Sequence, residues 1–399
     1  MPTSKTTSAK PAKNTTKSQS QCSLSISSKA LADTLRLLNS AISSNHKGLD
    51  RVQIEVSEGE SIYSVAGDTM GVKITHKARK NQQHEPIQVS CRQLMNLANQ
   101  LDNSNQKLDI SEEKLTVANI NRTYAHDLVT YKDILPQNKS EFAPVAIVKA
   151  EQFKQALDKV TPFANTEVKE VTSGICLQIK QAVEEEAEPH LILTGISNAG
   201  MGSSSLTIEA VENEVASDIE TDIMVILPKK AICFLASQAS GNFALSVAST
   251  AVRFSWENIE VTIQTMKGNF PDLEKTKASA KNNNVSVKFN RLELLAALRR
   301  HQVMSSEITF KITENNCYLT QATESGSGAE NVFCDWEYAE PATLIQHIDY
   351  LIKAVSNVGS ETVEFRLNMG VDEHGDVSNP IAIYDDHTLY YLVQLESEK

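Results

Sequence analysis

Apolar residues recur along this chain at two spacings, and the two spacings alternate in blocks. Apolar residues three or four positions apart predict amphipathic helices, each with one buried face. Six stretches have this pattern: Leu31, Leu35, Leu38 and Ile42; Leu94, Leu97 and Leu101; Phe153, Leu157, Val160 and Ala164; Ile232, Leu235 and Ala239; Leu294, Leu295 and Leu298; and Ile348, Leu351, Ile352 and Val355.

Between these helices, apolar and polar residues alternate, which predicts strands with one buried face. The clearest runs are Phe243, Leu245 and Val247; Val252, Phe254 and Trp256; Ile259, Val261 and Ile263; and Val285, Val287 and Phe289. Helix, strands, helix and strands follow one another three times along the chain. This order predicts an α+β fold of three tandem domains, each with two helices packed on antiparallel sheets.

The expected domain boundaries lie where polar residues interrupt the pattern. Such residues occur near Pro136 to Pro144 and in the Lys- and Asn-rich run from Lys275 to Asn284. The predicted domains are residues 22–136, 143–276 and 284–399, and a length of 399 residues requires more than one ordinary core. The acidic run at residues 184–188 is expected to be a solvated hairpin tip.

Residues 1–21 are rich in Ser, Thr, Lys and Pro and contain no acidic residue, which predicts a disordered basic tail. Its lysines either contact DNA or only keep the chain soluble. No apolar stretch approaches the roughly 20 residues needed to cross a bilayer, and no secretory signal is apparent. The six cysteines are scattered singly, without metal-ligand spacing. These features favour a reduced, cytoplasmic location.

Charge is distributed unevenly, although the net charge of −12 argues at first against a nucleic-acid partner. The predicted helices carry five acidic residues against twelve basic ones, which are Lys29, Arg36, Arg92, Lys149, Lys154, Lys159, Lys229, Lys230, Arg291, Arg299, Arg300 and Lys353. At 100° per residue, Lys29 and Arg36 lie nearly opposite the apolar face of their helix. Two interpretations stay open: a surface that attracts an anion, or the ordinary solvated face of amphipathic helices.

Motifs for catalysis are missing from the sequence. It has no phosphate-binding loop, dinucleotide fingerprint, nucleophile elbow or zinc-protease motif. Gly326-Ser327-Gly328 is interpreted as a flexible loop, and Asp385-Asp386-His387 as a hairpin turn. We therefore expect a protein without catalytic activity, cofactor or metal, and keep a soluble hydrolase only as the less favoured alternative.

Two motifs about forty residues apart carry a family resemblance. Ile226-Leu227-Pro228-Lys229-Lys230 leads into a helix, and Lys267-Gly268-Asn269-Phe270-Pro271-Asp272 closes the second domain. Together they resemble the bacterial DNA polymerase III beta subunit, the DNA sliding clamp. Val65-Ala66-Gly67-Asp68 and the stretch from Leu294 to Glu307 are similar to other parts of that family, so the resemblance covers about residues 22–399.

The resemblance implies a processivity factor that encircles duplex DNA without reading its sequence. It implies a head-to-tail homodimer whose helices line a pore, with DNA polymerase III and a clamp loader as partners. Twelve helices about 9 Å apart enclose a hole of about 25 Å, which admits a duplex. The expected pore residues are Lys29, Arg36, Arg92, Lys149, Lys154, Lys229, Lys230 and Arg299.

The family also binds partner peptides in a cleft between the second and third domains. Carried over by position, the cleft residues are Thr172, Gly174, Met201, Pro271, Lys275, Thr276, Val393, Gln394 and Leu395. Two segments depart from the family pattern: Ile196 to Met201 lacks the usual basic residues, and the chain ends in Glu396-Ser397-Glu398-Lys399. A divergent or replicon-specific clamp, or a clamp-like paralogue that acts as a decoy, is the alternative. For the subunit contact, the resemblance places Tyr124 and Leu128 opposite Val303 and Met304.

Overall fold

The computed structural model describes residues 22–42, 50–79, 83–121, 123–131, 140–166, 170–180, 188–211, 222–324, 326–336, 338, 340–368 and 380–395. The predicted basic tail, residues 184–187 of the acidic run and the divergent residues 396–399 lie outside this part. The chain divides into two compact units. The first comprises residues 1–67 and 72–137, and the second comprises residues 68–71 and 138–399.

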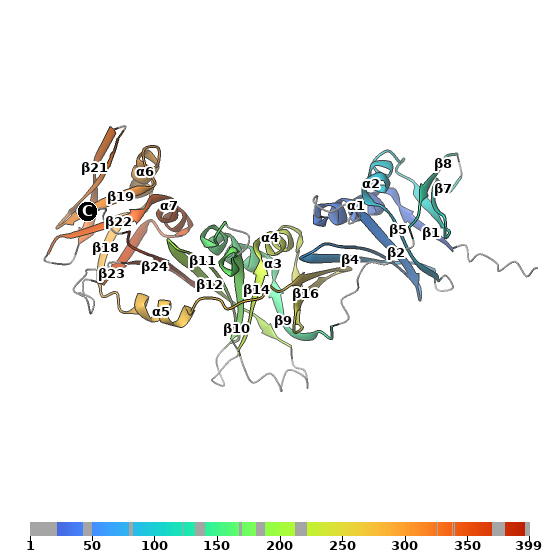
Figure 1. Ribbon diagram of the computed structural model, residues 1–399, viewed down its shortest axis with the longest axis horizontal. Helices are drawn as coiled ribbons and strands as arrows, with labels where there is room; N and C mark the ends of the chain where they lie inside the picture. The colour runs from blue at the N-terminus through green and yellow to red at the C-terminus, as the bar shows by residue number, and fades with distance from the viewer. Residues whose placement is uncertain are drawn as a thin grey trace, which may run out of the picture. The chain divides into compact units, whose positions relative to one another are not determined.

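In its described part, the first unit contains two antiparallel sheets and one pair of helices (Figure 1). One sheet has the strand order β1-β6-β7-β8, and β4, β3, β2 and β5 are neighbours in the other. The strands are β1 (Cys22–Ser27), β2 (Arg51–Ser57), β3 (Glu60–Ala66), β4 (Met70–Lys77), β5 (His84–Ser90), β6 (Asn105–Ile110), β7 (Lys114–Asn119) and β8 (Ala125–Val129). Helices α1 (Ser28–Ala41) and α2 (Cys91–Ala98) pack against each other.

Both helices of the first unit begin at a serine that ends a strand. The Ser27 side chain accepts a hydrogen bond from the Ala30 N–H, and the Ser90 side chain accepts one from the Gln93 N–H. These contacts satisfy amide groups that a helix start leaves unpaired. The predicted apolar face of α1 is buried, but the helices end earlier than the hydrophobic period suggested, at Ala41 and Ala98.

In the second unit, the described strands belong to two antiparallel sheets. One has the order β14-β10-β11-β12-β25-β24-β23-β18-β21-β20-β19-β22, and β13, β9, β15, β16 and β17 are neighbours, in this order, in the other. The strands are β9 (Ala143–Lys149), β10 (Gly174–Lys180), β11 (His190–Ser197), β12 (Gly200–Thr207), β13 (Glu209–Ala210), β14 (Ile223–Pro228), β15 (Asn242–Val247), β16 (Ala251–Trp256), β17 (Ile259–Gln264), β18 (Val285–Asn290), β19 (Glu307–Thr313), β20 (Asn316–Thr323), β21 (Gly326–Trp336), β22 (Ala342–His347), β23 (Thr362–Leu367), β24 (Ile381–Asp385) and β25 (Thr388–Leu392).

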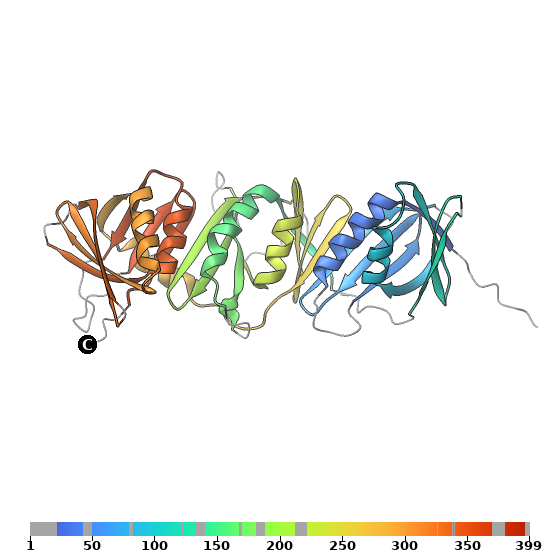
Figure 2. The same cartoon turned by 90° about the horizontal axis from the view of Figure 1, so that it is seen from above.

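Two further helix pairs cover one side of these sheets. Helix α3 (Ala150–Val160) packs on α4 (Lys229–Gln238), and α6 (Arg291–Gln302) packs on α7 (Ile348–Asn357). Figure 1 shows both pairs above the sheets of the second unit, and Figure 2 shows each pair from above. A fifth helix of this unit, α5 (Leu273–Lys281), lies on the opposite side of the large sheet.

The large sheet is continuous because β12 pairs with β25, from Gly200 opposite Leu392 to Ser204 opposite Thr388. Behind this pair, the buried Phe163 ring packs against Tyr390 and Tyr350, at centroid distances of 5.4 and 5.8 Å. The part of the second unit that contains α3 and α4 is therefore joined to the part that contains α6 and α7 by the hydrogen bonds of this strand pair and by a shared aromatic cluster.

One element was not predicted, and one local prediction was wrong. The polar run from Lys275 to Asn284 contains most of a helix, α5 (Leu273–Lys281). Its start is favoured by Asp272, whose carboxylate accepts hydrogen bonds from the N–H groups of Glu274 and Lys275. Gly326-Ser327-Gly328 is the paired start of β21 and not a flexible loop. The turn prediction at Asp385-Asp386-His387 is confirmed, with Asp386 at a φ of 48°.

None of the helices in the described ranges is long and apolar enough to span a membrane. Over the same ranges, no group of three or more His, Cys, Asp and Glu residues is arranged to hold a metal ion.

Candidate DNA-facing and partner-binding surfaces

The basic residues predicted for DNA binding in the first unit lie on the outer side of its helix pair. Lys29 and Arg36 in α1 and Arg92 in α2 are exposed. Arg36 pairs with Asp33, with Nη1 2.8 Å from Oδ1, and both side chains are more than half exposed. Because an exposed pair of this kind stabilises a fold only weakly, the Arg36 guanidinium stays accessible to another anion.

The residues of the second unit that were predicted to bind DNA are divided between the two helix pairs. Lys154 in α3, Lys230 in α4 and Arg299 in α6 are exposed. Lys149 is also exposed, but it is the last residue of β9 and the N-cap of α3, so it lies just outside the helix. Lys229 differs from these residues because it is partly buried.

Other basic residues of these helices are held by carboxylates of the fold. The Lys159 ammonium lies 2.9 Å from the Asp385 carboxylate, which is 8% exposed. Arg300 binds Glu330 through both Nε and Nη2. These partners are far away in sequence, so helix periodicity could not reveal them. The positive charge available to an external anion is therefore smaller than the sequence count suggested.

The residues predicted for the partner cleft gather around a small apolar cluster on the α5 side of the large sheet. The cluster consists of Cys176, Met201, Ile226, Phe270 and Leu273, with Val171, Ile196, Met266, Leu389 and Tyr391 packed against it. Among the predicted residues, Met201 is 1% exposed and part of the cluster itself. Gly174 lies beside it, since an added Cβ would meet Ile226 and Met266 at 2.7 Å.

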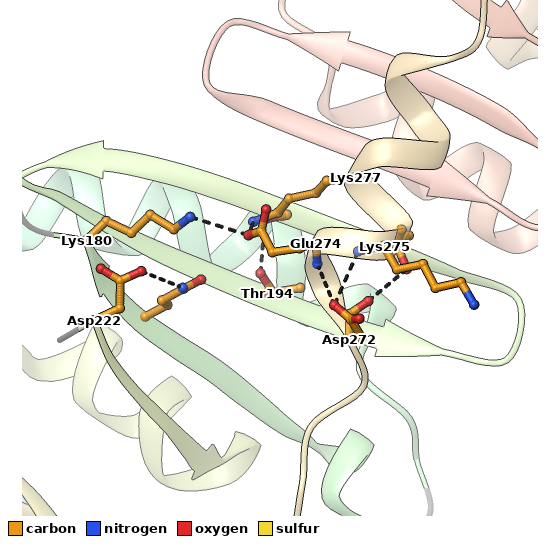
Figure 3. Close-up of polar contacts among 10 residues, drawn as sticks. Lys180, Thr194, Asp222, Asp272, Glu274, Lys275 and Lys277 are labelled. Atoms are coloured by element: carbon orange, nitrogen blue, oxygen red, sulfur yellow. Dashed lines mark hydrogen bonds and ion pairs between the residues drawn. The ribbon is translucent and has the colours of Figure 1, made fainter. Parts of the chain in front are cut away.

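The N-terminal half of α5 and the segment that leads into it carry three predicted cleft residues next to this cluster. Pro271 and Lys275 are exposed and Thr276 is partly exposed, while the neighbouring Leu273 is buried. Figure 3 shows how the helix is fixed: Glu274 pairs with Lys180 of β10 at 3.4 Å and with Lys277 at 3.6 Å. Although desolvation acts in the opposite direction, Lys277 and Lys180 lower the pKa of the Glu274 carboxyl.

The last described residues run along the other border of the cluster. The Val393 N–H donates to the Ala199 carbonyl at 3.1 Å, and the Leu395 N–H donates to the Ile345 carbonyl at 3.0 Å. Val393 is 42% exposed, whereas Gln394 and Leu395 are partly buried. The divergent stretch from Ile196 to Met201 is the hairpin between β11 and β12.

The Thr172 hydroxyl is less available to a bound peptide than the sequence suggested. It donates a hydrogen bond to the Glu170 carboxylate at 3.1 Å. The same carboxylate also accepts a hydrogen bond from the Asn165 amide at 2.7 Å. Leu273 and Tyr391 also contribute to this surface, although the sequence pattern did not predict it. Their signal was weak, because a buried leucine and a half-buried tyrosine occur in any sheet protein.

The residues predicted for the subunit contact lie at open strand edges and a helix end. Tyr124 precedes β8 and donates hydrogen bonds to Gln106 at 2.9 Å and Asp102 at 3.1 Å, and Leu128 is partly exposed within β8. Hydrogen bonds from Ser104, Gln106 and Tyr124 lower the pKa of the Asp102 carboxyl. Beyond α6, Val303 is 87% exposed and Met304 is 38% exposed.

These geometries define the class of the fold: pairs of helices on antiparallel sheets, with the sheet continuous between the second and third predicted domains. This is the fold of DNA sliding clamps. No family model matches the sequence, and no curated protein sequence matches it. Solved structures do match, which confirms the predicted fold class and the resemblance to DNA polymerase III beta subunits.

Three of the matching structures illustrate the likeness. The DNA polymerase sliding clamp from Pseudomonas aeruginosa has a TM-score of 0.79 at 16% sequence identity, over 94% of this chain and 99% of that chain. The sliding clamp from Caulobacter crescentus has a TM-score of 0.79 at 18% identity, over 94% and 100%. The Helicobacter pylori beta clamp bound to a DNA ligase peptide has a TM-score of 0.75 at 16% identity, with the same coverage.

Proposed function

We propose that this chain is a DNA sliding clamp, a processivity factor that encircles duplex DNA and acts by binding, without catalysing a reaction. The observation that carries the proposal is the set of exposed lysines and arginines on the paired helices of a clamp fold. Contacts between these cations and the phosphate backbone are independent of sequence and sensitive to salt, so the protein can slide.

Closure of the ring would come from a second copy of the chain in a head-to-tail arrangement. Two features support this. Among the described strands, β8 pairs only with β7. Residues 326–332 of β21 pair only with β20, because the described pairs of β18 reach Cys334 to Trp336. Open edges of this kind are suited to pairing with a strand from another chain. The exposed Val303 and Met304 lie close to the β21 edge, since Met304 Sδ would be 3.2 Å from a Cβ at Gly328.

Solution mass tests the dimer. We expect wild type at twice 43.9 kDa. Val303→Asp should shift the mass toward the monomer, because a carboxylate would be buried without a partner. Leu292→Asp is the matched control, since Leu292 is also an exposed aliphatic residue, at 65% exposure, but lies near the start of α6, whereas Val303 follows its end. A wild-type monomer, or equal effects of the two substitutions, contradicts the proposed contact.

Partner tethering is the second part of the proposal. We propose that the cluster around Met201, Phe270 and Leu273 is a peptide-binding surface, and that its binding partners are DNA polymerase III and a clamp loader. The Helicobacter pylori beta clamp supports this by analogy, since that protein binds a DNA ligase peptide. The cluster is apolar, and exposed residues of α5 and the exposed Val393 border it, as a short, partly apolar peptide would require.

The alternative is a clamp-like paralogue that pairs with, or competes against, another clamp. The observation that favours it is the altered border of the peptide surface. The β11–β12 hairpin carries no basic residue between Ile196 and Met201. A stable monomer that binds a second, different clamp would support this alternative over the closed homodimer.

A further inference from the structure

The apolar cluster around Met201 has a basic border on its α5 side. Lys267 lies in the segment that leads into α5, and Lys275 lies in the first half of the helix. Both side chains are exposed, and neither forms an ion pair with a carboxylate of the described residues. Their positive charge is therefore available to an anion that lies across the cluster.

The acidic residues of the same border are already engaged. The Asp272 carboxylate accepts hydrogen bonds from two N–H groups at the start of α5. The Glu274 carboxylate lies 3.4 Å from the Lys180 ammonium and 3.6 Å from the Lys277 ammonium. Both carboxylates thus hold α5 in place and do not neutralise the two exposed lysines.

On the other border of the cluster, the chain beyond β25 is held by two backbone hydrogen bonds. The Val393 N–H donates to the Ala199 carbonyl of the β11–β12 hairpin, and the Leu395 N–H donates to the Ile345 carbonyl of β22. The acidic residues Glu396 and Glu398 follow Leu395 almost directly, within the sequence Glu-Ser-Glu-Lys. Because four residues span at most about 14 Å, their carboxylates are confined to the neighbourhood of this surface.

The spacing of the two glutamates suits a contact with one surface. In an extended segment, residues two positions apart project to the same side. Glu396 and Glu398 can therefore face the same border together, and the two unpaired lysines there carry the complementary charge. A tether of a few residues also gives the segment a high local concentration, so exposed ion pairs that are weak individually are sufficient for binding.

We propose that residues 396–399 bind across the apolar cluster, with the carboxylates of Glu396 and Glu398 paired with Lys267 and Lys275, and that they compete there with a partner peptide. The inference rests on the proposed function, because it concerns the regulation of the proposed peptide-binding surface. A partner peptide has to displace the segment, so its affinity depends on charges that belong to this chain.

A carbodiimide tests the contact itself, because it joins a carboxylate directly to an amine that touches it. After digestion, mass spectrometry should find an amide bond between Glu396 or Glu398 and Lys267 or Lys275. The link should be lost in about 1 M salt, which screens exposed charges. Lys311 is the control, since it is an exposed lysine of β19 and should not be linked to this segment. Absence of the expected link from the full chain overturns the proposal.

Peptide affinity tests the competition. The probe is the DNA ligase peptide that binds the Helicobacter pylori beta clamp, carrying a fluorescent label. The variant that combines Glu396→Gln and Glu398→Gln should bind it about two- to fivefold more tightly than the wild type, as expected when one or two exposed ion pairs are removed. Glu314→Gln is the matched control, because Glu314 is an exposed acid of the β19–β20 turn and should leave the affinity unchanged.

The same substitutions in a Lys267→Gln, Lys275→Gln background distinguish competition from simple repulsion. Without the two lysines, removal of the glutamates should no longer improve peptide binding. An equal gain in both backgrounds would mean that the glutamates only repel the peptide, and would overturn the proposed contact. Equal affinities of the wild type and the glutamine variant would overturn the competition. If the peptide bound neither protein, the proposed peptide surface would fail, whereas the carbodiimide link would still show whether the segment lies on the cluster.

Discussion

At Gly195 the backbone of β11 passes so close to the end of α3 that no side chain fits. An added Cβ would lie 2.3 Å from the Val160 carbonyl oxygen and 3.1 Å from the Ala164 nitrogen. Since both atoms belong to packed backbone, we expect Gly195→Ala to lower the free energy of unfolding by about 1–3 kcal/mol. Urea unfolding can be followed by fluorescence, because Trp256 and Trp336 both lie in the second unit.

Gly326→Ala is the control for this substitution. Its Cβ would find only the Met304 Cε at 3.6 Å, an ordinary contact distance. Its unfolding midpoint should match that of the wild type. Equal midpoints for Gly195→Ala and the wild type would show that the end of α3 can move away at little cost.

His76 makes the stability of the first unit depend on pH. Its Nε2 lies 2.8 Å from the Thr34 hydroxyl of α1, and burial lowers the pKa of the imidazole below its ordinary value of 6.5. As the pH is lowered below about 6.5, His76 takes up a proton in the unfolded chain before it does so in the folded chain. The free energy of unfolding therefore decreases as the pH is lowered, until the pH reaches the pKa of His76 in the folded chain. We expect protection of the α1 amides from hydrogen exchange to decrease between about pH 7.5 and pH 5.5.

The substitution His76→Gln should reduce this loss of protection, after correction for intrinsic exchange rates. His387→Gln is the control, because His387 is exposed in the β24–β25 turn and should leave the pH dependence unchanged. An undiminished pH dependence in His76→Gln would exclude this imidazole as its cause.

At the level of single residues, sequence periodicity predicted well which side chains are buried. It predicted less well which charged side chains are not held in ion pairs. Leu31, Leu35 and Leu38 are fully buried, as their spacing required. Periodicity could not predict that Lys159 and Arg300 are paired, because their carboxylate partners come from strands far along the chain. Ion pairs of this kind depend on tertiary packing, which a local pattern does not contain.

Among the elements, α5 depends most on a single cap. Asp272→Ala removes the acceptor for two N–H groups and should cost about 1 kcal/mol of helix stability, whereas Asp272→Asn should retain the cap. Hydrogen exchange over residues 273–281 measures the effect, and faster exchange is expected in the alanine variant only. Faster exchange in both variants would mean that the carboxylate charge, and not the cap, stabilises α5.

The elements that the sequence failed to predict share a cause. Helix α5 is short and polar, with only Leu273 and Ala280 buried, so its hydrophobic period is faint. The start of β21 contains Gly326 and Gly328, which usually indicate a loop, but pairing with β20 makes it a strand. The six longer or more amphipathic helices were predicted because each buries a continuous apolar face.

At the scale of the whole molecule, the fold followed from the threefold order of helices and strands and from two short motifs. The domain boundaries and site residues stay predictions. An acidic chain can act on DNA only if its basic residues are concentrated on the surface that faces the DNA. Within each unit, exposed lysines and arginines lie on the paired helices. Their contacts are weak individually, so retention on DNA would have to come from closure of the ring.

Retention on circular DNA therefore distinguishes encirclement from ordinary binding. The purified protein is allowed to thread onto linear duplex, the ends are joined by ligase, and the DNA is washed in about 1 M salt, where the Debye length is only about 3 Å. If the protein encircles DNA, it should stay on the closed circle and leave when a single cut linearises it. Equal retention on circular and linear DNA, or loss from both, would contradict encirclement.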